Sequence, residues 1–228
     1  MEVFNTETVL KSENITTSGI FRLIQDVSAD HCEKLGLGGD VLNEKGIIWV
    51  VIRQYIKLDR ALKAGEKIKI STWPGMTRHM MFPRHYIFRD ENDDTVLRGT
   101  ALWTLVDMNS RKMVIPERYG LSLEGLSTGE EIKMPAAAEK IESSRSAEFT
   151  VPEEYLDSNR HMNNARYYDM SEHCMGREGA RIKEALTDYI SEARLGETIL
   201  LRWGEDKGRI YITGENQGTV FKMSLEYF

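Results

Sequence analysis

The amino-acid sequence repeats one order of predicted elements, and this duplication restricts the fold more than any other feature. In each half, a short alternating segment precedes apolar residues at helical spacing, and several strand-like segments follow. Matching residue pairs occur at corresponding places. The matches are Tyr55-Ile56 with Tyr189-Ile190, Gly65-Glu66 with Gly196-Glu197, and His31-Cys32 with His173-Cys174. The sequence therefore predicts two copies of one α+β unit, each a helix followed by a meander of strands.

Periodicity and turn residues set the boundaries of the predicted elements. In the first half we expect a strand at 2–10, a helix over about 20–35 ended by glycines, and strands at 46–58, 66–73, 80–90 and 95–106. In the second half we expect a strand at 147–151, a helix at about 164–177, and strands at 186–192, 197–203, 209–213 and 219–227. The chain thus divides into a first unit at 1–116, a linker at 117–146 and a second unit at 147–228.

The stretch from 156 to 168 carries the side chains best suited to chemistry. Asp157, Asn159 and His161 stand at alternating positions, so an extended segment would point all three to one side. Asn163 and Asn164 follow as N-cap candidates for a helix whose first N–H groups attract negative charge. The corresponding place in the first half, 14–18, has neither carboxylate nor imidazole, which favours a functional role. An ordinary polar loop is the alternative, because Asp, Ser and Asn are common turn residues.

The pattern L-D-x-N-x-H-x-N-N-x-x-Y, which ends at Tyr167, resembles the hallmark of the acyl-ACP thioesterases of plants and bacteria. The resemblance implies a double hotdog fold, in which each antiparallel sheet wraps around a helix. It also implies hydrolysis of the thioester between a fatty acyl chain and acyl carrier protein, in fatty acid biosynthesis. The first unit would then lie on the acyl-chain side and the second would carry the catalytic motif. Neither a metal nor a cofactor is implied.

The same resemblance adds Glu192, which stands in the family's Tyr-x-x-Glu pattern. Ala193 occupies the position where plant members carry a cysteine, so a cysteine nucleophile does not apply here. Asp157 would attack the carbonyl or activate water, with His161 assisting proton transfer. Asn159 would orient the nucleophile or the substrate, and Glu192 would fix His161 or the water. A backbone N–H near residues 164–165 would receive the oxyanion.

Composition restricts the partners and the location. The formal net charge is −6, so no basic field indicates nucleic acid or an anionic lipid surface. Two cysteines form neither a disulfide framework nor a metal-ligand cluster. The first residues lack the pattern of a signal peptide, and no apolar run is long enough for membrane insertion. We therefore expect a cytoplasmic protein, with a homodimer left open.

Acyl carrier protein, the implied partner, is acidic like this chain, so docking requires a local basic patch. The basic residues nearest the motif in sequence are Arg160, Arg166, Arg177, Arg181 and Lys183. Three other functions stay open. A hotdog acyl-CoA thioesterase or enoyl-thioester hydratase would use similar residues, although hydratases place two residues between the Asn and the His instead of one. The non-enzymatic alternative is a regulator that binds acyl thioesters.

Overall fold

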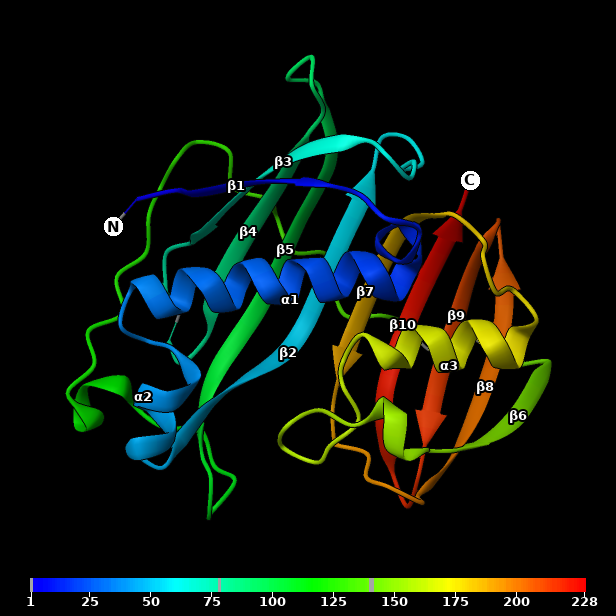
Figure 1. Cartoon of the computed structure of the whole chain (residues 1–228). Helices are drawn as coiled ribbons and strands as arrows, with labels where there is room; N and C mark the ends of the chain where they lie inside the picture. The colour runs from blue at the N-terminus through cyan, green and yellow to red at the C-terminus, as the bar shows by residue number, and fades with distance from the viewer. Residues whose placement is uncertain (1, 78, 140–141) are drawn as a thin grey trace.

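A computed structural model describes residues 2–77, 79–139 and 142–228, in which ten strands form one antiparallel sheet (Figure 1). The strands are β1 (Phe4–Val9), β2 (Ile47–Leu58), β3 (Lys67–Pro74), β4 (Phe82–Arg89), β5 (Thr95–Asp107), β6 (Arg145–Thr150), β7 (Ile182–Tyr189), β8 (Thr198–Asp206), β9 (Arg209–Glu215) and β10 (Thr219–Tyr227). The helices are α1 (Thr17–Lys34), α2 (Gly39–Glu44) and α3 (Arg166–Met175), with 3-10 turns η1 (Ser12–Ile15), η2 (Pro116–Tyr119) and η3 (Glu153–Tyr155). The order across the sheet is β1-β3-β4-β5-β2-β7-β10-β9-β8-β6, so β2 and β7 join the two halves.

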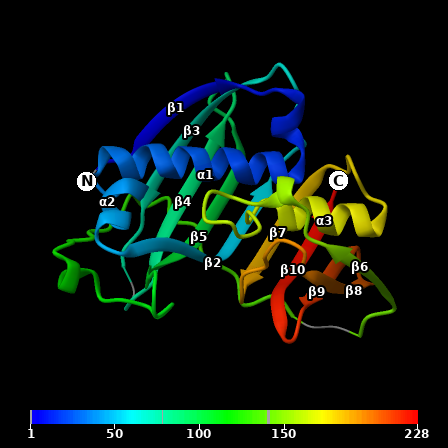
Figure 2. The ribbon, with the colours of Figure 1, turned by 60° about the horizontal axis from the view of Figure 1, so that its bottom comes forward.

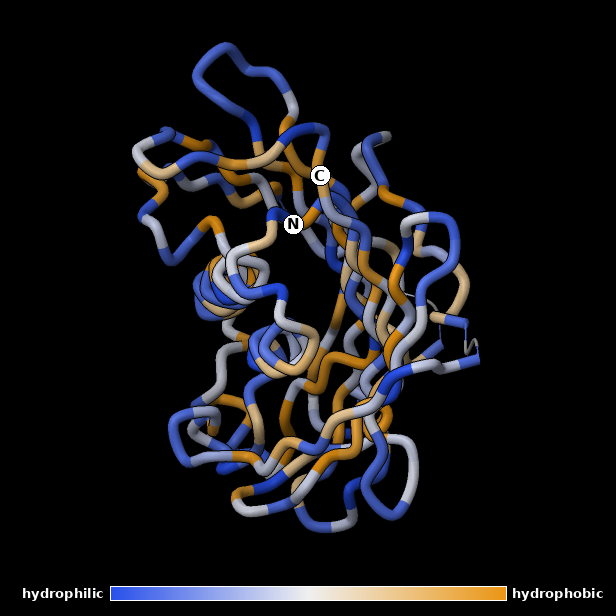
Figure 3. Tube along the Cα trace, turned by 90° about the vertical axis from the view of Figure 1, so that its right-hand side faces the viewer, coloured by the Kyte–Doolittle hydropathy of each residue, from blue (hydrophilic) through white to orange (hydrophobic). Residues whose placement is uncertain are grey.

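Both long helices lie on the same side of this sheet, as Figure 3 shows from the side. α1 crosses the strands of the first half and α3 crosses those of the second half, one after the other along the sheet (Figures 1 and 2). Phe21 of α1 stacks on Tyr168 of α3 with ring centroids 4.2 Å apart. The helix-facing side chains of both halves form one continuous apolar core, which makes the two halves a single packed body.

The turn before the third strand of each half shows the duplication in atomic detail. The Gly65 N–H donates to the Leu10 carbonyl at 2.7 Å, and the Gly196 N–H donates to the Val151 carbonyl at 2.9 Å. Both glycines have a positive φ, 85° and 76°, which an L side chain adopts only with strain. The matched Gly-Glu pairs in the sequence therefore mark one left-handed turn by which each unit enters its third strand.

Local sequence explains why α1 begins and ends where it does. The Thr16 side chain accepts a hydrogen bond from the Gly19 N–H at 3.0 Å, as an N-cap residue does. Four large apolar residues at helical spacing face the sheet and are almost fully buried: Ile20, Phe21, Ile24 and Val27. After Lys34, Gly36 adopts a left-handed φ of 69°, which ends the helix.

The structure corrects three of the predicted boundaries. The glycines after α1 also begin a short second helix, α2, because the Glu33 side chain accepts the Gly39 N–H and Leu42 packs in a small separate core. β7 covers Ile182–Tyr189, not 186–192, because its pairing with β10 ends at Tyr189 and its pairing with β2 ends at Asp188. α3 begins at Arg166, two residues later than predicted. Among the described residues, no helix is long and apolar enough to cross a membrane.

Candidate active site

The motif segment forms a tight loop instead of the extended strand that its alternation predicted. The Asp157 N–H donates to the His161 carbonyl at 2.8 Å, and the Asp157 carbonyl accepts the Arg160 N–H at 3.0 Å. Arg160 has a left-handed φ of 61°. The loop closes between the bridged residues Leu156 and Met162, so residues 157–161 are not extended and the predicted alternation of faces does not hold for this segment.

Asp157 uses its carboxylate to hold this loop together. Its Oδ1 accepts the Asn159 N–H at 2.8 Å and the His161 N–H at 3.2 Å. This is the usual way in which an Asp side chain stabilises a turn, and it fixes the carboxylate beside His161. Asn159 is exposed in this loop, whereas Asp157 and His161 are half-buried.

His161 and Glu192 do come together. His161 Nε2 lies 3.2 Å from Glu192 Oε2, with 18% of the imidazole and 33% of the glutamate side chain exposed. The loop after β7 carries Glu192 to this position, and the Ala193 carbonyl accepts the Met162 N–H at 2.8 Å. The backbone of the motif loop is thus tied directly to the segment that presents the glutamate.

Arg111 also reaches this pair, although no feature of the sequence predicted it. Arg111 lies in the turn after β5, in the first half, and its guanidinium forms an ion pair with Glu192. Nothing in the local sequence distinguishes it from the other exposed arginines, because the contact exists only once the two halves share a sheet. Glu192 therefore sits between a cation from one half and an imidazole from the other.

The surroundings lower the pKa of His161. Burial disfavours the charged imidazolium, and the positive charges of Arg111 and Arg194 act in the same direction. The Asp157 carboxylate opposes this effect by favouring the protonated ring. Because the net shift is downward, His161 is mainly neutral at neutral pH, the form that accepts a proton.

The start of α3 lies next to the motif loop. Asn163 Oδ1 accepts the Ala165 N–H at 2.9 Å, whereas the N-cap position, Ala165, has no capping side chain. The Asn164 N–H has no acceptor among the described residues, so it is the candidate oxyanion donor of the two that the sequence indicated. The Tyr189 hydroxyl lies 3.1 Å from both the Asn164 carbonyl and Gln54 Oε1, and thereby links this helix start to β2.

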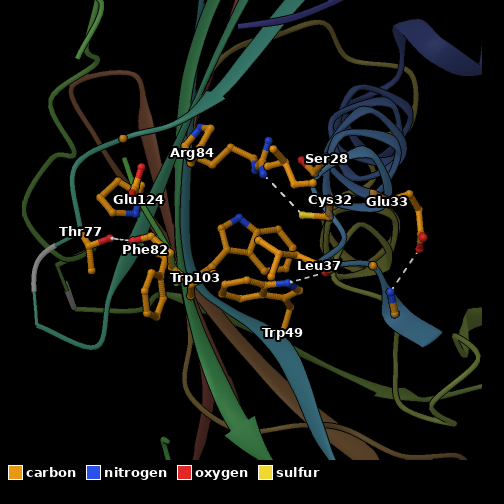
Figure 4. Close-up of a pocket in the computed structure, with 18 of the residues that line it drawn as sticks. Ser28, Cys32, Glu33, Leu37, Trp49, Thr77, Phe82, Arg84, Trp103 and Glu124 are labelled. Carbon is orange, nitrogen blue, oxygen red and sulfur yellow. Dashed lines mark hydrogen bonds between the residues drawn. The ribbon is translucent and has the colours of Figure 1, made fainter. Parts of the chain in front are cut away.

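A cavity of about 250 Å³ opens in the first half, on the helix-bearing side of the sheet (Figure 4). Its apolar walls come mainly from Trp49 of β2, Phe82 of β4, Trp103 of β5 and Leu37. Trp49 and Gln54 lie on the same strand, and Gln54 contacts Tyr189 beside the start of α3. The cavity and the His161–Glu192 pair are therefore both built around the central strands of one sheet.

The remaining candidates are less suited to chemistry. Burial raises the pKa of both thiols, Cys32 and Cys174, which makes them poor nucleophiles. In the described part of the chain, no group of three or more His, Cys, Asp and Glu side chains is placed to hold a metal ion. Three of the five basic residues near the motif are ion-paired. The pairs are Arg166 with Asp169, Arg177 with Glu205, and Lys183 with Glu226.

Solved structures share this architecture over nearly the full chain. An acyl-ACP thioesterase from Bacteroides thetaiotaomicron superimposes with a TM-score of 0.82 at 18% identity, covering 99% of this chain and 98% of that one. The 12:0-ACP thioesterase from Umbellularia californica gives a TM-score of 0.80 at 17% identity, covering 99% and 97%. The predicted double hotdog fold is thereby confirmed.

The sequence matches one family along most of its length. The model of the acyl-ACP thioesterase N-terminal domain matches residues 6–119, and that of the C-terminal domain matches residues 138–223. The protein therefore belongs to the acyl-ACP thioesterase family, as its motif predicted.

Curated relatives in plants are distant and longer. The chloroplastic acyl-[acyl-carrier-protein] hydrolase FATB2 of Cuphea viscosissima is 24% identical over 159 residues, which is 63% of this chain and 39% of that protein. The chloroplastic palmitoyl-acyl carrier protein thioesterase of Arabidopsis thaliana is 24% identical over 172 residues, or 69% and 41% of the two lengths. The matched part thus spans about two fifths of each of these relatives.

Proposed function

We propose that this protein hydrolyses fatty acyl-acyl carrier protein, releasing a free fatty acid and holo-acyl carrier protein in fatty acid biosynthesis. The observation that carries the proposal is the 3.2 Å contact between His161 and Glu192, in a chain that belongs to this family. Membership of the family supports the substrate class. The apolar cavity in the first half supports binding of an acyl chain.

The geometry favours general-base hydrolysis. A neutral His161 that donates its Nε2–H to Glu192 keeps the Nδ1 lone pair to take a proton from water. The water oxygen adds to the thioester carbonyl, and the Asn164 N–H is the candidate donor to the resulting oxyanion. When the C–S bond breaks, His161 returns the proton to the sulfur, so the products are a carboxylic acid and a thiol. Asp157 is the alternative nucleophile or base, and Asn159 would orient the substrate at the loop tip.

Free-thiol release from matched acyl substrates tests the reaction. We expect wild-type protein to release thiol from fatty acyl-acyl carrier protein and to lose this activity in His161→Ala. Comparable or faster release from acyl-CoA would transfer the assignment to an acyl-CoA thioesterase. Hydration of a trans-2-enoyl thioester without thiol release would identify a hydratase. Saturable binding with no turnover of any substrate would support the regulator.

We also propose that the protein acts in the cytoplasm. Both cysteines are free thiols in the structure, which suits a reducing compartment. Cell fractionation tests the location. A homodimer is a separate expectation, which light scattering on the purified protein tests.

A further inference from the structure

Arg84 is a buried cation in the wall of the apolar cavity. It lies on β4, is 6% exposed, and extends toward α1 above the two cavity tryptophans (Figure 4). Its Nη1 lies 2.9 Å from His31 Nδ1 and 3.4 Å from Thr72 Oγ1, and its Nη2 lies 3.4 Å from Cys32 Sγ. The guanidinium therefore has an imidazole, a hydroxyl and a thiol as its partners.

All three partners are neutral. Burial, followed by the charge of Arg84, lowers the pKa of His31 to about 4, so the imidazole is an uncharged acceptor. Burial raises the pKa of Cys32 and keeps its thiol protonated. Among the described residues, no carboxylate lies within ion-pair distance of Arg84. A buried charge without a countercharge is costly unless its hydrogen-bonding capacity is satisfied.

That capacity is incomplete. A guanidinium carries five N–H donors in a fixed plane, and the three recorded contacts leave the Nε–H and one Nη2–H without an acceptor. Two donors of one guanidinium in the cavity wall are thus without an acceptor among the described residues. An oxygen atom of a ligand would satisfy them.

The shape and charge of the cavity define that ligand further. Trp49, Phe82 and Trp103 provide apolar walls, and the volume of about 250 Å³ exceeds the roughly 150 Å³ engineered cavity that holds benzene. The cavity therefore accommodates an aliphatic chain. Glu33 and Glu124 also line it and are exposed, so a ligand carboxylate would meet negative charge. A neutral oxygen acceptor avoids that repulsion.

We propose that the cavity holds the distal part of the acyl chain, and that Arg84 selects chains carrying a hydroxyl or keto oxygen there. This inference rests on the proposed function, because the chain would enter as the acyl group of a thioester substrate. Arg84 is then a specificity-determining residue, remote from the bond that breaks. A plain alkyl chain would fill the same space but offer no acceptor to these two Arg84 donors, which disfavours its binding.

Competition between acyl-acyl carrier proteins of one chain length provides the test. The set comprises the unsubstituted chain, chains with one hydroxyl at mid-chain or at the chain end, and a control chain with its hydroxyl beside the thioester carbonyl. We expect at least one of the mid-chain and chain-end substrates to exceed both the unsubstituted chain and the control by about tenfold in kcat/KM, a difference of about 1.4 kcal/mol. The preferred isomer would locate the oxygen relative to the thioester.

Variants of Arg84 connect any such preference to this side chain. Arg84→Met should abolish the preference, and the matched control Arg89→Met should retain it, because Arg89 lies on the same strand but pairs with Glu130 outside the cavity. Arg84→Lys keeps the positive charge with fewer N–H donors and should retain part of the preference. This variant still tests the role of Arg84 when Arg84→Met does not fold. Equal or faster turnover of the unsubstituted chain by wild type would overturn the inference but leave the proposed function intact. Failure to hydrolyse every substrate would instead reject the proposed function.

Discussion

At the scale of single residues, the candidate site combines side chains from three loops that lie far apart along the chain. His161 comes from the loop before α3, Glu192 from the loop after β7, and Arg111 from the turn after β5. The ion pair with Arg111 fixes Glu192 on one side, and Glu192 orients the imidazole on the other. The lowered pKa of His161 keeps the imidazole neutral for base catalysis.

Replacing Asp157 by Asn separates the charge of this residue from its role in the loop. The Asn side chain keeps an oxygen that can accept the N–H groups of Asn159 and His161, so the loop should persist. We expect turnover of acyl-acyl carrier protein to fall by at least about 100-fold, the lower range for a general acid–base or nucleophilic group. Thermal unfolding should remain close to wild type. Wild-type turnover in this variant would restrict Asp157 to a structural role.

The influence of Arg111 on His161 predicts a change in the pH profile. Because the pKa of His161 is lowered, kcat/KM should rise with pH and level off below the pH expected for an ordinary histidine. Arg111→Gln removes a positive charge and releases Glu192, and both changes favour the imidazolium. The rising limb should therefore move to higher pH. The neighbouring Lys112→Gln serves as the control, and equal shifts in both variants would contradict a specific role for Arg111.

At the scale of elements, the sequence predicted the regular parts and missed those that depend on tertiary contacts. The apolar spacing from Ile20 to Val27 was sufficient for α1, and the Gly-Glu pairs that matched in sequence form the same turn in the two halves. The segment at Asp157 forms a turn and not an extended segment, because alternating polar residues occur in both. The hydrogen bonds from backbone N–H groups to the Asp157 carboxylate favour the turn. Arg111 was not predictable, since its partner lies in the other half of the chain.

The junction between α1 and α3 contains a buried acid. Glu172 Oε1 accepts hydrogen bonds from Thr17 Oγ1 at 2.5 Å and from the Tyr227 hydroxyl at 3.2 Å. Burial raises the pKa of Glu172 to about 7, while these hydrogen bonds partly offset the shift. The folded protein thus holds a proton here that the unfolded chain loses near its ordinary value of 4.5. Between these two pH values, unfolding releases a proton.

Stability should therefore decrease as pH rises from about 4.5 to about 7, by up to about 3 kcal/mol from this group alone. Glu172→Gln keeps a hydrogen-bonding side chain without the titration, so its unfolding free energy should lose less over this range. Chemical denaturation at several pH values measures the difference between the two proteins. Glu117→Gln, an exposed change in η2, is the control and should follow the wild-type curve closely. Parallel curves for wild type and Glu172→Gln would show that Glu172 does not titrate in this range.

At the scale of the whole molecule, the two similar units have unequal content. The second unit carries His161 and Glu192, while the first carries the cavity and sends Arg111 to the site. The central pair of strands, β2 and β7, brings these contributions together. The duplication was readable from sequence, but this exchange between halves follows from the shared sheet. A substrate whose acyl chain binds in the first unit and whose thioester is hydrolysed in the second would use both units.

The second unit, which carries His161 and Glu192, also carries the basic residues that an acidic carrier protein would meet. Arg160 precedes His161 in sequence, and Arg194 forms a β-bridge with His161, so both arginines lie beside the His161–Glu192 pair. Both arginines are exposed, and neither forms an ion pair within the described residues. Arg177, by contrast, is paired with Glu205 and stacks on Tyr227 beyond the far end of α3. Because the chain has a net charge of −6, local positive charge must guide docking.

Reversing Arg160 and Arg194 to Glu should raise the KM for acyl-acyl carrier protein about tenfold or more, and less so at high salt, where charge interactions are screened. Arg194 also affects the pKa of His161, so the assay belongs at about pH 8, above the ordinary histidine value, where the imidazole stays neutral in both proteins. Hydrolysis of a small acyl-pantetheine should change little, because this substrate has no protein surface to dock. Arg177→Glu is the matched control and should leave both substrates unaffected. Equal losses on both substrates would mean that the reversal damages the chemistry, and no loss on either would place the carrier protein on another face.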